Sequence, residues 1–157
     1  MRLVQLASLI VFGLAGLFLL PARLKRLGRA DALIALLSVH VFRVLALFTI
    51  QAQRDGYPIS NIAVTEIVVG DLLGAAIALA GILLLRGGAR LGVLLSWLVI
   101  VETVVDFAVG IHRKTIEPLK VDVTGPLWPI LAFFVPLVIV TLPFLAWQLV
   151  ARRKEPL

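Results

Sequence analysis

The sequence contains no cysteine. This absence excludes a disulfide framework, a thiolate metal site, a thiol nucleophile and covalent c-type haem attachment. Charged residues are also scarce, at 15% of the 157 residues against about 25% in an average soluble domain. The established signatures of enzymes and carriers, including G-x-S-x-G, Walker A, H-E-x-x-H and the dinucleotide fingerprints, do not occur. No motif therefore selects an enzyme or carrier class.

Hydrophobic residues, in contrast, make up 61% of the chain, where soluble domains average roughly 45 to 50%. They fall in long runs and do not alternate with polar residues, so a soluble core of this size could not hold them. The formal charge of +6 would suit nucleic acid, but Lys and Arg gather at the ends of the apolar runs, as they do in membrane proteins. We therefore expect a lipid bilayer as the surroundings and no nucleic-acid partner.

The apolar runs have the length of membrane spans. A hydrocarbon core of about 30 Å requires roughly 20 apolar residues in a helix. Five segments meet this requirement, at residues 3–20, 32–50, 62–85, 91–111 and 127–150. The connections between them are too short to fold alone. The sequence predicts an all-α, polytopic membrane bundle of about five helices, forming a single domain over residues 1–157.

The basic residues near the span ends predict the orientation. The larger group follows the first and third spans and the last: Arg23, Lys25, Arg26, Arg29, Arg86, Arg90, Arg152, Arg153 and Lys154. The smaller group on the other side, partly offset by Asp55, Glu117 and Asp122, is Arg2, Arg54, Arg113, Lys114 and Lys120. We expect an N-terminus outside and a C-terminus in the cytoplasm, in a bacterial inner membrane. We expect the first run to stay uncleaved, because it lacks a small-x-small site and a basic cluster follows it.

Ionisable residues interrupt three of the apolar spans: His40, Arg43, Glu66, Asp71, Glu102 and Asp106. Each central Asp or Arg costs about 2.5 to 3.5 kcal/mol on insertion scales, so these groups must pair or take up protons. At about 1.5 Å per residue, all but Glu66 lie near the midplane or slightly outward of it, with Glu66 about 11 Å outward. The pattern predicts a polar cluster between the second, third and fourth spans, and all six residues are candidates for ligand or proton binding.

The excess of negative charge in this cluster limits what it can bind. Arg43 stays charged and is expected to hold one carboxylate bidentately, leaving the others without a fixed counter-charge. The missing positive charge could come from a proton, a charged His40, or a metal or organic cation. A structural ion-pair network is the alternative. His40 with Glu102 and Asp106 would suit a transition metal, but no HxxxH or Glu-x-x-His pair occurs, so no metal site is predicted and the cofactor stays open. Asp71 or Glu102 could instead accept a hydrogen bond from His40.

Small residues and prolines mark two of the helices. The third span carries Gly70, Gly74, Ala78 and Gly81, a pattern that predicts a face for close helix packing. The last span carries Pro129, Pro136 and Pro143. The two inner prolines free the carbonyls of Ala132 and Ile139, which then need partners from neighbouring helices, hydroxyls or water. We expect kinks there that shape a groove in the bundle.

One stretch of about 35 residues carries a resemblance: His40, Phe42, Arg43, Leu45, Gly56, Pro58, Ala63, Gly70, Asp71 and Gly74. It resembles small bacterial multi-pass membrane proteins of unassigned function, in which an H-x-F-R helix precedes a G-x-P turn and a Gly-Asp helix. The resemblance implies no activity. It implies only that Arg43 and Asp71 form a unit.

Three hypotheses follow for function. The first is a protein that binds or transfers a small molecule, ion or proton at the midplane cluster, open toward the outside. The second is a structural or accessory subunit that has a membrane protein partner. The third is an intramembrane enzyme acting on a lipid or isoprenoid, since His40 with two acids can perform acid-base chemistry.

Overall fold

The computed structural model describes residues 2–116 and 127–157 of the chain. Five segments are helical, long and apolar enough to cross a membrane: Leu3–Leu24, Arg29–Arg54, Asn61–Arg86, Leu91–Arg113 and Leu127–Ala151. No strand occurs in the described residues, and the predicted all-α bundle is confirmed. Helices suit such runs because they satisfy backbone N–H and C=O groups internally, where no water can do so. Glu117, Lys120 and Asp122, which entered the orientation prediction, lie outside the described residues.

Three spans are single helices: α1 (Arg2–Leu24), α4 (Asn61–Arg86) and α5 (Leu91–Ile116). The second span consists of α2 (Arg29–Val41), η1 (Phe42–Leu47) and α3 (Phe48–Arg54), and the last consists of α6 (Leu127–Pro129), η2 (Ile130–Phe134) and α7 (Val135–Ala151). The Ser60 hydroxyl begins α4 by accepting a hydrogen bond from the Ala63 N–H. After α4, Gly88 adopts a φ of +69°, a conformation that only glycine reaches without strain.

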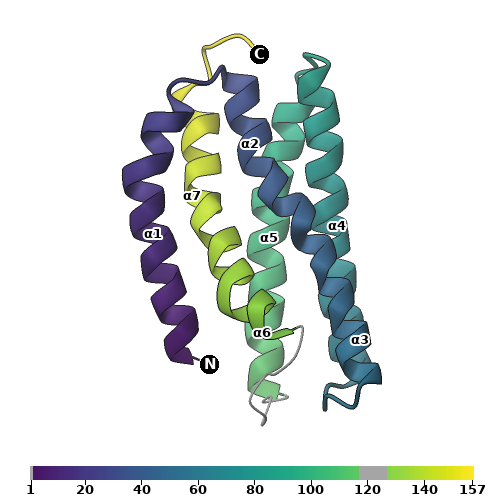
Figure 1. Cartoon of the computed structure of the whole chain (residues 1–157). Helices are drawn as coiled ribbons and strands as arrows, with labels where there is room; N and C mark the ends of the chain where they lie inside the picture. The colour runs from purple at the N-terminus through teal and green to yellow at the C-terminus, as the bar shows by residue number, and fades with distance from the viewer. Residues whose placement is uncertain (1, 117–126) are drawn as a thin grey trace.

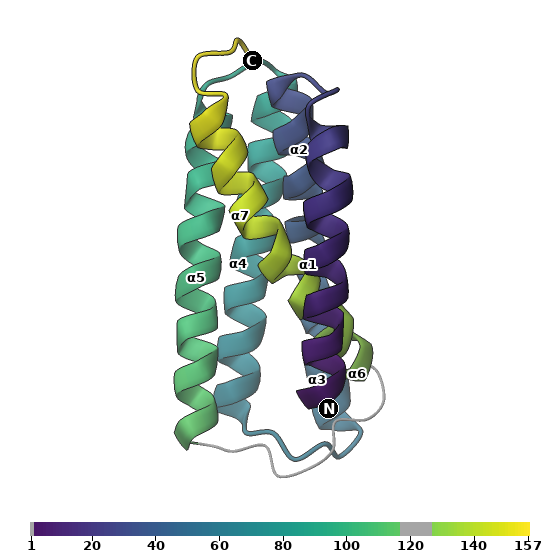
Figure 2. The same cartoon turned by 90° about the vertical axis from the view of Figure 1, so that its left-hand side faces the viewer.

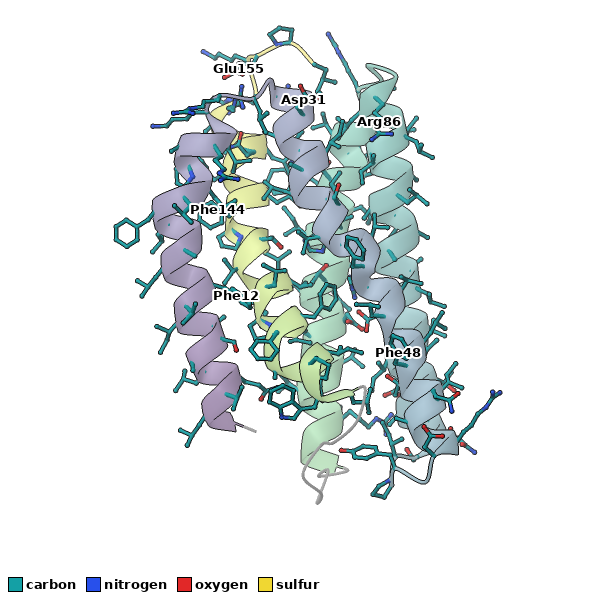
Figure 3. All side chains as sticks on the ribbon, viewed as in Figure 1. Phe12, Asp31, Phe48, Arg86, Phe144 and Glu155 are labelled. Atoms are coloured by element: carbon teal, nitrogen blue, oxygen red, sulfur yellow. The ribbon has the colours of Figure 1, made fainter. Side chains whose placement is uncertain are left out.

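The helices stand side by side, with the two termini at opposite ends of the bundle (Figure 1). α4 packs along α5 and also against α2, whereas α7 contacts α1, α2 and α5. α1 lies at the edge of the bundle, where it packs against α7 and η2 (Figures 1 and 2). Asp31, Arg86 and Glu155 lie at the same end as the C-terminus (Figure 3). This end also holds most of the basic residues that the sequence places at span ends.

An apolar core fills the part of the bundle nearer the C-terminus. Leu33 and Leu37 of α2, Ala78 of α4, Val99 of α5 and Leu145 of α7 expose no surface. We call these five residues the apolar core. Leu33 and Leu37 are four positions apart, so both side chains project from one face of α2.

Two glycines bring α4 and α5 together beside this core. A Cβ atom on Gly92 would lie 2.9 Å from the backbone nitrogen of Leu85 and 3.1 Å from the carbonyl oxygen of Gly81. Real Cβ atoms rarely approach backbone so closely, so this crossing requires glycine at position 92. Gly81 therefore lies at a helix contact, as the small-residue pattern of the third span predicts.

The second span is not the uniform helix that its apolar run suggests. Phe42–Leu47 form a 3₁₀ helix, in which each turn takes about 3.0 residues and rises about 2.0 Å per residue. Such a stretch is unusually long for this conformation and changes the angle at which later side chains leave the helix. Arg43 lies within it and points to α4 and α5.

The last span changes its winding before its second proline. Ile130–Phe134 form a π-helical turn, and Pro136 follows at the start of α7. A wide turn at this point accommodates the proline ring, which cannot continue a regular α-helix. The Gln5 side-chain amide of α1 donates a hydrogen bond of 2.8 Å to the Leu131 carbonyl oxygen. A neighbouring helix thus supplies a partner near the proline, as expected, although at Leu131 and not at the predicted Ala132.

Candidate functional site

The centre of the site is a single buried guanidinium. Arg43 is 2% exposed and reaches three carboxylates on two helices. Its Nε donates to Asp71 at 2.7 Å, its Nη2 donates to Asp106 at 2.8 Å, and both terminal nitrogens donate to Glu102. Its Nη1 also donates to the Thr103 hydroxyl at 3.0 Å. We call these five residues the Arg43 cluster.

The sequence predicts the members of this cluster but not how they share the arginine. The expectation was one carboxylate held bidentately, with the others left without a fixed counter-charge. Arg43 holds Glu102 with both terminal nitrogens, as expected, but it also contacts Asp71 and Asp106, because a guanidinium carries five N–H donors in a planar fork. Asp71 and Asp106 each accept from one nitrogen, while Glu102 spans the two terminal nitrogens. One positive charge still faces three carboxylates.

Two glycines of α4 provide the space for the cluster. A Cβ atom on Gly74 would overlap the Arg43 guanidinium and the Glu102 carboxylate, and one on Gly70 would overlap the Asp106 carboxylate. The sequence predicts a helix-packing role for both. In the structure, that role belongs to Gly81, whereas Gly70 and Gly74 admit charged side chains between α4 and α5.

Glu66 lies apart from the Arg43 cluster. Its carboxylate accepts hydrogen bonds from Nε of Arg113, at 2.7 Å, and from Nη2 of the same residue. Both side chains are partly exposed, at 33% for Glu66 and 28% for Arg113. The expectation that Glu66 joins the unpaired carboxylates is therefore wrong, because Glu66 pairs with Arg113. The sequence places Arg113 only among the basic residues at the span ends and predicts no partner for it.

His40 also lies apart from the carboxylates. It exposes no surface, and its Nε2 is 3.3 Å from the Thr141 hydroxyl of α7. That hydroxyl donates to the Val138 carbonyl oxygen at 2.8 Å, so His40 Nε2 must carry the proton and donate to it. The other ring nitrogen has no hydrogen-bond partner among the described residues. The predicted bond from His40 to Asp71 or Glu102 is wrong, and His40 joins α2 to α7 instead.

The metal set that the sequence suggested does not assemble. Within residues 2–116 and 127–157, no three His, Asp or Glu side chains are arranged to hold a metal ion. His40 is turned toward Thr141, away from Glu102 and Asp106. What the Arg43 cluster can do is hold protons among its three carboxylates.

A polar seam connects the Arg43 cluster with the end of the bundle that carries α3. On α4 it consists of Gly74, Gly70 and Glu66, spaced four apart and so on one face. On α5 the facing residues are Glu102, Asp106 and Arg113. One turn beyond Asp106, a Cβ atom on Gly110 would meet nothing within 4 Å. Polar or small residues thus recur at helical spacing along α4 and α5 between the cluster and the Glu66–Arg113 ion pair.

Three residues that bind the predicted site residues are not themselves predicted as site residues from the sequence: Thr103, Arg113 and Thr141. Thr103 follows Glu102 directly, and threonine is too common in apolar helices to signal a site. Thr141 lies in a span without charges, far from His40 along the chain. Only Arg113 carried a signal, because it falls two helical turns after Asp106 on the same helix.

Comparison with known proteins identifies one family. The model of a family described as a domain of unknown function (DUF8737) matches residues 1–150. No curated protein and no solved structure matches the chain.

Proposed function

The chain belongs to the DUF8737 family, and we propose that it is a multi-pass membrane protein that binds and releases protons at the Arg43 cluster. In this proposal Arg43 holds the three carboxylates together. Asp71, Glu102 and Asp106 share the proton, and the α4–α5 seam exchanges it with one side of the membrane.

The observation that carries the proposal is the charge imbalance of the cluster. Arg43 is charged in any protein environment, so three ionised carboxylates would leave two uncompensated negative charges in the bundle. Such charges are expensive at midplane depth, and carboxylates that share one site resolve the repulsion by keeping a proton. A proton is favoured over a metal ion because the described side chains form no metal-binding group.

The direction of exchange follows from the seam. The Glu66–Arg113 pair lies where the seam reaches the α3 end, and both partners are partly exposed. The opposite end carries the larger basic group, which favours the cytoplasm. We therefore assign the α3 end to the outside of a bacterial inner membrane, with the N-terminus outside and the C-terminus in the cytoplasm.

The proposal is tested by stability against pH. If the native cluster holds a proton that the unfolded chain does not, raising the pH removes it and lowers the unfolding temperature. Glu102→Gln and Asp106→Asn should flatten this alkaline decline in purified protein. Asp55→Asn is the control, since Asp55 is an exposed carboxylate outside the Arg43 cluster that accepts a hydrogen bond from Gln51. Identical profiles for wild type and both cluster variants would refute the proposal, and a dependence on Na⁺ in place of pH would move it to a cation.

A second function, that of an accessory subunit, is supported by the edge position of α1. Only 11% of its most apolar 18-residue window is buried, and large side chains such as Leu6, Ile10 and Phe18 are exposed along it. Such a face suits either lipid or a partner helix. Purification in mild detergent distinguishes the two: a stoichiometric membrane protein that dissociates on Ile10→Ser would support the subunit, and a monomer would oppose it.

A further inference from the structure

A groove lies between part of α1 and α7, and none of its lining residues belongs to the Arg43 cluster. Its volume is about 440 Å³, within the range of sites that hold small molecules. Phe144 lies between the two helices (Figure 3). The walls are almost wholly apolar: Leu17, Pro21, Lys25, Val140, Pro143, Phe144 and Trp147.

The groove begins where close contact between the helices ends. At Gly16 a Cβ atom would lie 2.9 Å from the Phe144 ring and 3.1 Å from a Val140 methyl group, so α1 and α7 touch there. Beyond Gly16, toward the C-terminal end of the bundle, Pro21 and Trp147 wall an open space. Its lining residues on α1 run from Leu17 to Lys25, so the groove is a slot that extends toward the basic end of the bundle.

One charge marks the mouth of this slot. Lys25 is the only charged lining residue, and its ammonium pairs with no other residue in the described part of the chain. The nearby Arg152, in contrast, already has partners, because it donates hydrogen bonds to Glu155 and to the carbonyl oxygens of Leu24 and Leu27. Trp147 is 38% exposed, as is usual for tryptophan at the level of lipid headgroups.

We infer that this groove binds an anionic phospholipid, with one acyl chain in the slot and the phosphate at the Lys25 ammonium. The apolar walls match a hydrocarbon chain, and the unpaired cation at the open end matches a negative headgroup. Arg23 and Arg26 flank Lys25 in the sequence and add to the positive field, which attracts anionic lipids at short range. This site is independent of the proton proposal.

Quenching of Trp147 fluorescence tests the inference. The chain has two other tryptophans, so Trp97→Phe and Trp128→Phe leave Trp147 as the reporter. The protein is placed in phosphatidylcholine vesicles with a small fraction of brominated phosphatidylglycerol or, separately, brominated phosphatidylcholine. We expect the anionic lipid to bind about fivefold more strongly, the effect of one basic residue near the membrane surface. Lys25→Gln should remove most of this preference.

Arg90→Gln is the matched control, because Arg90 lies at the same end of the bundle but on the turn between α4 and α5. It should leave the preference intact. Equal quenching by the two lipids in wild type would overturn the inference. Equal losses in both variants would also overturn it, since they would indicate a general surface charge. Absence of quenching by either lipid would likewise overturn the inference.

Discussion

Two regions of the bundle are held together by opposite means. In the apolar core, close-packed side chains expose no surface and carry no charge. In the Arg43 cluster, one guanidinium and three carboxylates pack between η1, α4 and α5. A buried ion network rarely stabilises more than apolar residues of similar volume would. This difference supports the proposal that the cluster binds protons, whereas the apolar core contributes to the fold alone.

The largest expected effect comes from Arg43→Leu. It leaves three carboxylates without their cation, and breaking a buried ion pair by removing one partner costs about 3 to 5 kcal/mol. The free energy of unfolding in detergent measures this loss. The loss should shrink at acidic pH, because protonated carboxyls no longer repel one another. A combined Asp71→Asn, Glu102→Gln and Asp106→Asn background should recover much of the stability, and no recovery there would contradict the account.

Leu37→Ala is the counterpart in the apolar core. Removing a fully buried leucine side chain costs about 2 to 5 kcal/mol through lost contacts and the cavity left behind. The same unfolding measurement should give an equal loss at acidic and neutral pH, since no ionisable group contributes. A pH-dependent loss would mean that the two regions are not separate.

Gly74→Ala should be smaller, at about 1 to 3 kcal/mol, the usual effect of overpacking. The added methyl group overlaps the Arg43 guanidinium, which three carboxylates and Thr103 hold in place. Gly13→Ala is the matched control, because a Cβ atom there meets nothing within 4 Å and alanine favours a helix. Thermal unfolding of both variants measures the difference. If Gly74→Ala is as stable as Gly13→Ala, the cluster is not tightly packed against α4.

Thr141→Val should have the smallest effect. It removes the hydroxyl to which His40 donates, and hydrogen bonds between membrane helices average about 0.6 kcal/mol. The unfolding midpoint should fall slightly without a change in its pH dependence. A changed pH profile would show that His40 belongs to the proton site after all.

Much of the cluster could be predicted from the sequence, because depth along a helix follows from residue count. Arg43, Asp71, Glu102 and Asp106 fall at similar depths, and charges at that depth have to meet. The direction in which each side chain leaves its helix is harder to predict from the sequence. The 3₁₀ segment that carries Arg43 and the π turn before Pro136 both change the angle of later side chains, and no periodic pattern encodes them. The angle between His40, which precedes the 3₁₀ segment, and Arg43, which lies in it, therefore differs from that of a regular α-helix, and His40 faces Thr141.

The roles of the glycines could not be predicted for a related reason. Gly70, Gly74 and Gly81 form one small-residue stripe in the sequence, and all three suit close helix packing. Their roles differ only because different side chains face each glycine in the structure. Gly81 meets α5 directly, whereas Gly70 and Gly74 face carboxylates and the guanidinium.

The central claim is that the Arg43 cluster holds a proton, and infrared spectroscopy in lipid vesicles measures this most directly. A protonated carboxyl gives a C=O stretching band that is distinct from carboxylate and amide bands. We predict such a band in wild type at neutral pH, its loss on alkaline titration, and its absence from the Asp71→Asn, Glu102→Gln, Asp106→Asn variant. Wild type without this band at neutral pH, or the triple variant with the same band, would contradict the claim.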